Sequence, residues 1–270
     1  MRLVRFSLDP QTRPSAPDSA PGVRWGILEE GRFRQITGDP LGQWITTDSV
    51  YDSSRVRLLP PCAPTKIVCV GRNYVEHAKE LNNPLPPEPL LFLKPPSALI
   101  ASGDDIVWPP ESERVDFEGE LGVVMGRRCS QIRDPQEALE YAFGYTCLND
   151  VTARDLQKRD VQFTRGKGFD TFCAVGPCLA PRGELDPGQL SLRTCLDGQI
   201  RQDGNTRDMI FPVGVIIAYI SRVMTLEPGD LIATGTPAGV GPMAPGSTVT
   251  VVIEGIGELR NPVRRREERP

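Results

Sequence analysis

Frequent glycine and proline set the strongest limit on how this chain can fold, because they account for 26 and 27 of its 270 residues. Both residue types interrupt helices and favour turns. Their combined share stays below the level typical of low-complexity disorder, and apolar residues still make up 39% of the chain. The sequence therefore predicts a folded protein built from many short strands, turns and loops.

Short apolar runs between these turn residues predict the strands. We expect strands at 66–71, 90–93, 117–125, 145–148, 231–234 and 248–253, the second of them buried. Helical patterns are fewer and do not alternate regularly with the strands, which argues against a doubly wound sheet or a TIM barrel. The expected fold class is α+β and β-rich, with a few peripheral helices.

Four helices are expected. The first is short and carries His77. The second opens at Asp134 as N-cap and closes at Gly144, and the third starts at Thr152 with the same capping logic. The longest covers 211–224. Its predicted apolar stripe consists of Val215, Ile216, Tyr219, Ile220 and Val223.

The chain divides into three predicted segments. Residues 1–60 form a small N-terminal β segment, in which 23–28 and 32–36 are expected to pair as a hairpin. A proline-rich stretch then marks the boundary to the main domain, 61–263. Residues 264–270 are a charged tail that we expect to fray.

Charge and cysteine content exclude several functions. The net charge is −4 at pH 7 and no basic patch stands out, so nucleic acid is not an expected partner. The seven cysteines have scattered spacings and no C-x-x-C motif, which indicates reduced, buried thiols. No apolar run is long enough for a secretory signal or a membrane span. We expect a cytoplasmic protein that has no membrane partner.

Glu118, Glu120 and Asp150 are the candidate metal ligands. The two-residue repeat of a strand places Glu118 and Glu120 on the same face. A solvated outer face is the simpler interpretation, but the apolar residues that follow make unpaired burial costly. Asp150 ends a later strand and completes an all-oxygen ligand set. Such a set favours Mg²⁺, with Mn²⁺ or Ca²⁺ as alternatives.

His77 is the only histidine in the chain and the candidate general base. Histidine is the side chain that titrates near neutral pH without any environmental shift. Residues three apart share a helix face, so Glu80 can hold the imidazole while Glu76 points elsewhere. A partly buried packing residue is the commoner role for a single histidine on a short helix, so this position alone does not decide the function.

Five further residues could bind or stabilise an anionic substrate. Arg154 and Gln157 lie three apart on one predicted helix and can point to the same region. Lys167 stands between two glycines, which let the backbone approach a ligand closely, although a surface turn is the alternative. Gly235 offers a backbone N–H and Thr236 a hydroxyl at the end of a strand. That arrangement suits a carboxylate and equally an ordinary turn.

Five motifs together resemble the fumarylacetoacetate hydrolase family. They occur in the family's order across roughly residues 62–263, and the set is far more specific than any one motif. The motifs are Gly-x-Asn-Tyr-x-x-His-x-x-Glu at 71–80, Asp-Phe-Glu-Gly-Glu-Leu at 116–121, Asn-Asp-x-x-Ala-Arg-Asp-x-Gln at 149–157, Gly-Lys-Gly-Phe-Asp-Thr-Phe at 166–172 and Thr-Gly-Thr-Pro-x-Gly-Val-Gly at 234–241. Residues 1–60 resemble the family's variable N-terminal segment only loosely.

The resemblance implies a mixed β-roll of the family's C-terminal type, usually assembled as a homodimer. It also assigns a role to each candidate residue. The implied roles are Mg²⁺ or Mn²⁺ binding by Glu118, Glu120 and Asp150, a catalytic dyad of His77 and Glu80 on a lid helix, stabilisation of negative charge by Lys167, and substrate binding by Arg154, Gln157 and Thr236.

The expected activity is metal-dependent hydrolysis of a C–C bond in acylpyruvate-type 2,4-dioxo acids, through a pyruvate enolate bound to the metal. The substrate is a small anionic 2-oxo acid. Oxaloacetate decarboxylation and isomerisation of 2-hydroxyhepta-2,4-diene-1,7-dioate pass through the same kind of intermediate, so both stay open. A non-enzymatic β protein with a structural metal is the weaker alternative, because a structural ion needs no residues that bind an anion.

Overall fold

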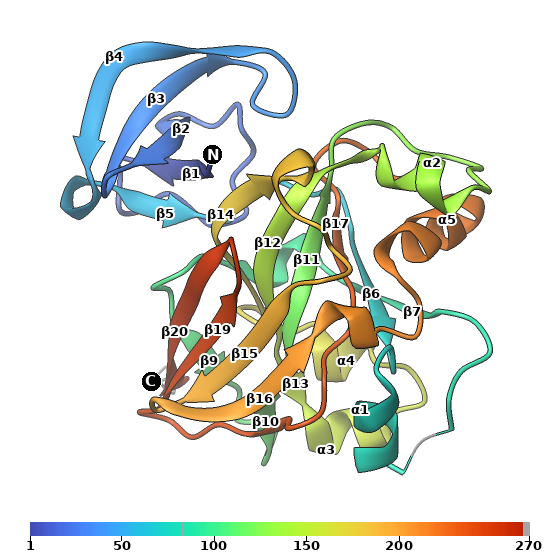
Figure 1. Ribbon diagram of the computed structural model, residues 1–270. Helices are drawn as coiled ribbons and strands as arrows, with labels where there is room; N and C mark the ends of the chain where they lie inside the picture. The colour runs from blue at the N-terminus through green and yellow to red at the C-terminus, as the bar shows by residue number, and fades with distance from the viewer. Residues whose placement is uncertain (83, 267–270) are drawn as a thin grey trace.

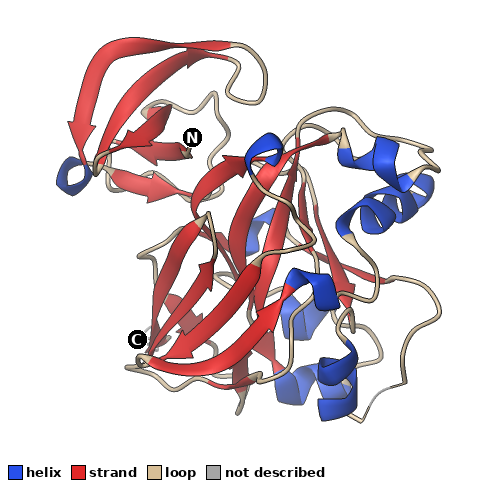
Figure 2. Cartoon of the chain, in the orientation of Figure 1, coloured by secondary structure: helices blue, strands red, loops and turns tan. Residues whose placement is uncertain are grey.

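The computed structural model describes residues 1–82 and 84–266. Strands are the most abundant regular elements (Figure 1), and short helices lie at the periphery of the molecule (Figure 2). The predicted β-rich α+β fold is confirmed. Within the described residues, no helix has the length and apolar character needed to cross a membrane.

The N-terminal segment, at the upper left of Figure 1, is a small set of strands. Its elements are β1 (Leu3–Ser7), β2 (Val23–Glu29), β3 (Arg32–Gly38), β4 (Trp44–Asp52), η1 (Ser53–Arg55) and β5 (Arg57–Leu59). The predicted hairpin is present as β2 and β3, joined by a turn at Glu30 and Gly31, both with positive φ. β1 also pairs with β14 (Cys173–Pro181), so this segment continues a sheet of the main body.

The main body supplies the remaining elements. Its other strands are β6 (Ile67–Gly71), β7 (Leu90–Lys94), β8 (Leu99–Ile100), β9 (Ile106–Trp108), β10 (Val115–Phe117), β11 (Gly119–Met125), β12 (Ala142–Asp150), β13 (Thr152–Ala153), β15 (Ser191–Leu196), β16 (Gln199–Asn205), β17 (Leu231–Ala233), β18 (Gly241–Pro242), β19 (Thr248–Ile253) and β20 (Gly257–Arg265). Its helices are α1 (Val75–Glu80), α2 (Pro135–Leu139), α3 (Arg154–Arg159), α4 (Thr164–Lys167) and α5 (Val213–Val223), with 3₁₀ turns η2 (Pro96–Ala98), η3 (Arg182–Glu184) and η4 (Thr206–Asp208).

The strands form one long sheet and two smaller ones. The long sheet has the order β4-β3-β2-β1-β14-β12-β11-β17-β6-β7, the second β16-β15-β19-β20-β9 and the third β13-β10-β18. Most neighbours are antiparallel, but β6 and β17 run parallel. The chain therefore leaves both of these strands at the same edge of the sheet. As a result, α1, which follows β6, lies beside the loop 234–241, which follows β17.

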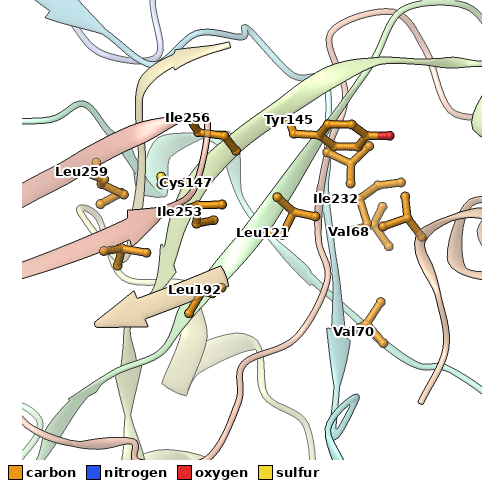
Figure 3. Packing of buried hydrophobic residues seen from close by; sticks show 14 of the residues in the cluster. Val68, Val70, Leu121, Tyr145, Cys147, Leu192, Ile232, Ile253, Ile256 and Leu259 are labelled. Atoms are coloured by element: carbon orange, nitrogen blue, oxygen red, sulfur yellow. The ribbon is translucent and has the colours of Figure 1, made fainter. Parts of the chain in front are cut away.

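One part of the hydrophobic core lies between the long sheet and the second sheet. Figure 3 shows Leu121 of β11 and Cys147 of β12 grouped with Leu192, Ile253 and Leu259 of the second sheet. Each of these side chains is at most 1% exposed. Burying a side chain such as leucine or isoleucine contributes about 1.5–3 kcal/mol. This layer therefore holds β11 and β12, the strands that carry the candidate metal ligands, in a fixed register.

The helix predicted for 134–144 is shorter in the structure. It begins as expected, because the carboxylate of Asp134 accepts the backbone N–H of Gln136 at 2.9 Å. It ends at Leu139, and Gly144 does not close it. Gly144 lies within β12, where a Cβ atom would stand 2.2 Å from the carbonyl oxygen of Ala180. Close strand packing, not helix termination, requires the glycine.

The apolar stripe predicted for the longest helix is partly wrong. Val223 is 61% exposed. The buried apolar residues of α5 are Val213, Ile216, Ile217, Ala218 and Ile220. The helix packs against α2, and a Cβ atom at Gly214 would stand 2.3 Å from the carbonyl oxygen of Pro135. This close contact with α2 fixes the face that α5 buries.

Three other local predictions differ from the structure. Thr152 does not cap α3, because its hydroxyl donates to the carbonyl oxygen of Asp150 and its backbone belongs to β13. The strand β7 is not fully buried: it lies at the sheet edge and leaves Leu93 48% exposed. Arg264 and Arg265, assigned to the tail, belong to β20. The predicted fraying of 267–270 lies outside the described residues.

Buried thiols predict a loss of stability at alkaline pH. Six of the seven free cysteines are buried, and burial raises the pKa of Cys62 to about 12 and of Cys178 to about 11. The unfolded chain ionises its thiols at about pH 8.5, whereas the folded chain keeps the thiols of Cys62 and Cys178 protonated at that pH. The contribution of these thiols to the free energy of unfolding should therefore stay constant below about pH 8.5. Above that pH it should fall, by up to about 1.4 kcal/mol per pH unit per thiol.

Urea unfolding between pH 7 and pH 10.5 measures this dependence. Cys62→Ala should flatten the alkaline part of the curve relative to the parent protein. Identical alkaline slopes for the variant and the parent would contradict the assignment to Cys62.

Candidate active site

Glu118, Glu120 and Asp150 meet where β11 and β12 pair. The backbone N–H of Asp150 donates to the carbonyl oxygen of Glu118 at 2.8 Å, so these residues are cross-strand neighbours. Glu120 follows two residues later in the chain. All three side chains are buried, and each places a carboxylate oxygen within 4.8 Å of the others. The structure therefore assembles the predicted three-carboxylate cluster.

The strand predicted for 117–125 is interrupted at Glu118. There the backbone N–H of Glu118 donates to Oδ1 of Asn149 at 2.9 Å, between β10 and β11. The interruption lets β10 join the third sheet while β11 stays in the long one. Glu118 thus lies at the junction of two sheets, facing the helices α3 and α4.

Two buried lysines pair with the carboxylates of the cluster. Nζ of Lys167 donates to Oε2 of Glu118 at 2.7 Å and also to Oδ2 of Asp150. Nζ of Lys94 donates to Oδ1 of Asp150 at 2.5 Å and to the carbonyl oxygen of Val151 at 3.1 Å. Each lysine is 2% exposed. Both oxygens of Asp150 therefore have a cationic partner.

Arg154 connects the cluster to α3. Its Nε donates to Asp116 at 2.9 Å, its Nη1 to Oε1 of Gln157 at 2.6 Å, and its Nη2 to Glu118. The predicted convergence of Arg154 and Gln157 is therefore present. Because three of its N–H groups bind protein oxygens, the guanidinium mainly orients Glu118. The amide nitrogen of Gln157 stays available to a ligand.

The surroundings shift the pKa values of Glu118 and Glu120 in opposite directions. Burial alone would raise the pKa of Glu118, but the charges of Lys167 and Arg154 bring it well below its usual range. Burial, together with the charges of Asp150 and Glu118, raises the pKa of Glu120 well above its usual value. Glu120 is thus the carboxylate of the cluster with the least compensation by cations.

The residues present fit a hard divalent cation. Their ligand atoms are all oxygens, and the poorly compensated Glu120 needs a positive charge beside it. The buried carboxylates of Asp116 and the cluster outnumber the buried cations Lys94, Arg154 and Lys167 by one. With all of these groups ionised the net charge is −1, and a divalent ion would turn it into +1. The site would then attract an anionic ligand.

The helix α1 places His77 and Glu80 on another wall of the site. Nδ1 of His77 lies 3.2 Å from Oε2 of Glu80, and His77 is 5% exposed. Oε1 of Glu80 accepts the backbone N–H of Gly239 at 3.0 Å, which ties the helix to the loop 234–241. Glu76 points to the surface, as predicted. Glu80 therefore orients the imidazole of His77, and the loop 234–241 in turn holds Glu80 in place.

Gly235 and Thr236 support the cluster from this loop. The backbone N–H of Gly235 donates to Oε2 of Glu120 at 2.7 Å, so it is not open to a substrate carboxylate as the sequence suggested. The hydroxyl of Thr236 lies 2.8 Å from the carbonyl oxygen of Gly119 and 2.7 Å from Nε2 of Gln202. Thr236 nevertheless lines the cavity.

The glycines around Lys167 serve packing. A Cβ atom at Gly166 would stand 2.9 Å from the backbone nitrogen of Gln157, and one at Gly168 would stand 2.4 Å from the carbonyl oxygen of Thr164. The small size of Gly166 lets α4 lie directly on α3, whereas Gly168 avoids a clash with a carbonyl of α4 itself. The expected role of giving a ligand access to the backbone is therefore not seen. The close packing instead places Lys167 against the carboxylates.

One cavity of about 360 Å³ connects these groups. Nine of the ten predicted site residues line it, and Gly235 lies behind Glu120. The nine are His77, Glu80, Glu118, Glu120, Asp150, Arg154, Gln157, Lys167 and Thr236. A cavity of this size, with convergent polar groups, suits a small-molecule ligand.

Sequence reasoning missed four residues of the site: Lys94, Asp116, Arg72 and Phe92. Lys94 is one of only five lysines, which was the available signal for it. Phe92 lies under the ammonium group of Lys167, 5.1 Å from Nζ to the ring centroid. Asp116 was visible only as part of a motif, and Arg72 had no sequence signal beyond its place in the 71–80 motif.

Comparison with known proteins identifies the family. Residues 66–264 match the fumarylacetoacetate (FAA) hydrolase C-terminal family, and residues 1–61 match the Rv2993c-like N-terminal family. The chain therefore belongs to the fumarylacetoacetate hydrolase family, as its motifs indicated.

Two similar sequences and two similar structures illustrate this membership. Protein Rv2993c of Mycobacterium tuberculosis is 47% identical over 89% of this chain and 91% of its own length. The mitochondrial oxaloacetate tautomerase fahd2 of Xenopus laevis is 40% identical over 79% of this chain and 70% of its own length.

The structure of 2-hydroxyhepta-2,4-diene-1,7-dioate isomerase from Mycobacterium marinum has 43% identity and a TM-score of 0.86, and covers 99% of this chain and 100% of its own. Maleylpyruvate hydrolase from Sphingobium sp. SYK-6 has 30% identity and a TM-score of 0.77, covering 98% of this chain and 100% of its own. Enzymes named for isomerisation and for hydrolysis thus share this fold.

Proposed function

We propose that this protein hydrolyses a C–C bond in acylpyruvate-type 2,4-dioxo acids. One observation carries the proposal: the hydrogen-bonded pair of His77 and Glu80 lines the same cavity as the three-carboxylate cluster. A general base on one wall and a cation site on another can activate water beside a bound 2-oxo acid.

Glu118, Glu120 and Asp150 are the residues that would hold Mg²⁺ or Mn²⁺. When bound, the cation supplies Lewis-acid polarisation of the substrate's 2-oxo group. Lys167 adds a buried positive charge beside the same carboxylates, while Arg154 keeps Glu118 oriented. Gln157 and Thr236 line the cavity. The side-chain amide of Gln157 can donate to the substrate's carboxylate or oxo group. The hydroxyl of Thr236 donates to the carbonyl oxygen of Gly119, so it would have to turn toward the cavity to bind the same groups.

His77 activates the attacking water. An ionised Glu80 can only accept, so the neutral imidazole carries its proton at Nδ1 and leaves Nε2 free to take a proton from water. The resulting hydroxide attacks the acyl carbonyl. The C–C bond then breaks, and its electron pair stays on the pyruvate fragment.

Lys167 stabilises the negative charge that develops on this enolate fragment. Protonation of its carbon gives pyruvate, and the acyl fragment leaves as a carboxylic acid. One water is consumed, and no oxidant or reductant is needed.

Isomerisation or decarboxylation of a 2-oxo acid, without hydrolysis, is the second candidate function. Similarity to the M. marinum isomerase and to the X. laevis tautomerase favours it. Dienedioate isomerisation, or decarboxylation of oxaloacetate, would need the same stabilisation of an enolate by Lys167. Neither needs water activated by His77.

Pyruvate release from a short acylpyruvate tests the proposal, with Mg²⁺ present and again after treatment with EDTA. We expect release that depends on the metal. Folded protein that releases no pyruvate under either condition would contradict hydrolysis and would turn attention to oxaloacetate and the dienedioate. A homodimer remains our prediction for the assembly.

A further inference from the structure

We propose that Gln202 is a positioning residue that fixes two walls of the active site relative to each other. It lies on β16, behind the lining of the cavity, and it binds both the backbone between Glu118 and Glu120 and the loop 234–241. The inference rests on the proposed function, because it adds a residue to the same site. Its main test, the binding of Mn²⁺, does not depend on hydrolysis.

The side-chain amide of Gln202 is fully buried and bonded at both ends. Its Oε1 accepts the backbone N–H of Gly119 at 2.9 Å. Its Nε2 donates to the hydroxyl oxygen of Thr236 at 2.7 Å and to the carbonyl oxygen of Pro237 at 2.8 Å. A flipped amide would set its nitrogen against an N–H donor and its oxygen against a carbonyl oxygen, so these partners determine its orientation.

On one side, Gln202 holds the backbone between two candidate metal ligands. Gly119 separates Glu118 from Glu120 and begins β11, just after the interruption of the strand at Glu118. An interruption leaves backbone N–H groups that need other partners. Side-chain amides supply them at two consecutive residues, since Asn149 binds the N–H of Glu118 and Gln202 binds that of Gly119.

The hydroxyl of Thr236 closes a ring of three hydrogen bonds. It accepts from Gln202 and donates to the carbonyl oxygen of Gly119 at 2.8 Å, while the N–H of Gly119 donates back to Gln202. Both backbone polar groups of this glycine are therefore fixed. Their bonds set the directions in which the carboxylates on either side of it leave the backbone.

On the other side, Gln202 holds the middle of the loop 234–241. Within this loop, the N–H of Gly235 donates to Glu120, and the N–H of Gly239 donates to Glu80. The loop thus contacts the cluster at one point and the His77–Glu80 pair at another, and the amide of Gln202 lies between these points in its contacts along the chain.

Close packing keeps β16 directly against this loop. A Cβ atom at Gly204 would stand 2.8 Å from Cβ of Pro237, and one at Gly239 would stand 2.1 Å from the carbonyl oxygen of Arg201. The strand therefore gives Gln202 a rigid base. Residues that hold metal ligands in this indirect way commonly affect metal affinity and activity.

Gln202→Met tests the role, because it keeps the length of the side chain and removes all three hydrogen bonds. We expect the Kd for Mn²⁺ to rise by roughly 10–100-fold, the usual effect of losing a residue that supports a metal ligand. Isothermal titration of the protein without substrate measures it. At saturating Mn²⁺, kcat for pyruvate release should still be lower by about tenfold or more, with a smaller change in KM, because the loop no longer holds Glu80 in place.

Thr194→Val is the matched control. Thr194 of β15 lies opposite Gln202 in the strand pair and packs against Gly119, where a Cβ atom would stand 2.0 Å from its Oγ1. Among residues 1–82 and 84–266, this buried hydroxyl has no hydrogen-bond partner. The variant therefore changes packing at the same glycine without removing a bond, and it should leave both the Kd for Mn²⁺ and kcat unchanged.

Thr236→Val provides a second variant, which opens the ring but leaves the bonds of Gln202 to Gly119 and Pro237. It should raise the Kd for Mn²⁺ by a smaller factor, and it tests the ring even if Gln202→Met does not fold. Because both substitutions break the same network, their effects on the Kd should not multiply in the double variant. An unchanged Kd in Thr236→Val, or fully multiplied effects in the double variant, would overturn the proposal.

The thermal midpoint of each variant separates positioning from stability. A residue that only stabilised the fold would lower this midpoint and leave the Kd for Mn²⁺ and kcat as in the parent, and that result for Gln202→Met would overturn the proposal. An equal rise of the Kd in Thr194→Val would overturn it too, because packing would then be responsible.

The outcome for Mn²⁺ binding is distinguishable from the outcome for hydrolysis. Binding that depends on Gln202, found in folded protein that releases no pyruvate, would contradict the proposed hydrolysis and leave the positioning role in place. A parent protein that binds no Mn²⁺ would overturn both. Hydrolysis by the parent, together with an unaltered Gln202→Met variant, would overturn the positioning role alone.

Discussion

Replacing His77 with alanine should lower kcat for acylpyruvate hydrolysis by about 10³-fold, while KM changes little. A positioned general base contributes on the order of 10²–10⁴ to a rate. No second histidine exists in the chain to take over the role. Steady-state pyruvate release from the same acylpyruvate, with Mg²⁺ at saturation, measures the effect.

Two variants of the same helix sharpen this experiment. Glu80→Gln should lower kcat by a smaller factor, because the amide can still contact Nδ1 but no longer favours the tautomer with a free Nε2. Glu76→Gln changes an exposed carboxylate one residue away from His77 and should leave kcat unaltered. His77→Ala enzyme with the full hydrolytic rate would refute the dyad. Turnover of oxaloacetate should respond less, because no water needs activation.

Glu120→Gln and Asp150→Asn should both abolish metal-dependent activity, yet differ sharply in their effect on the metal-free protein. Asp150 is the shared partner of Lys94 and Lys167, so its neutralisation leaves buried ammonium groups poorly paired. Breaking a buried ion pair in this way costs about 3–5 kcal/mol. Among the described residues, 1–82 and 84–266, no cation lies within hydrogen-bonding distance of Glu120, and its neighbours repel it, so Glu120→Gln should cost less than about 1 kcal/mol.

Urea unfolding in EDTA measures the stability difference, and titration with Mn²⁺ measures the loss of metal binding. The parent protein in EDTA is the reference for both. Equal losses of stability in the two variants would show that the lysines do not depend on Asp150. Undiminished Mn²⁺ binding by Glu120→Gln would remove Glu120 from the ligand set.

Local geometry explains which parts of the site were predictable from sequence. His77 and Glu80 are one helical turn apart, and Glu118 and Glu120 are one strand repeat apart, so spacing alone places each pair on one face. The five motifs then indicated the family and its β-roll. None of these inferences required knowledge of which distant segments come into contact.

The partners of these residues depend on contacts between segments that are far apart in the chain, and these were not predictable. Lys94 lies 56 residues from Asp150, and Gly235 lies 115 residues from the Glu120 that it binds. Such contacts also override local sequence signals. Gly144 was predicted to end a helix, but it lies in a strand where the neighbouring strand leaves no room for a Cβ atom. The position of a glycine or a lysine in the sequence does not indicate which distant residue it will contact.

The parallel pairing of β6 with β17 also has a consequence for how the protein is made. Ile67 pairs with Leu231, so the helix that bears His77 obtains its neighbouring loop only after most of the chain has left the ribosome. Pairings between such distant residues form slowly. A nascent chain that stops before Leu231 would contain His77, Glu118 and Glu120, but it would lack β17 and the loop 234–241 that binds Glu80 and Glu120. Truncated products should therefore fail to bind metal, which makes Mn²⁺ binding a direct report of complete synthesis and folding.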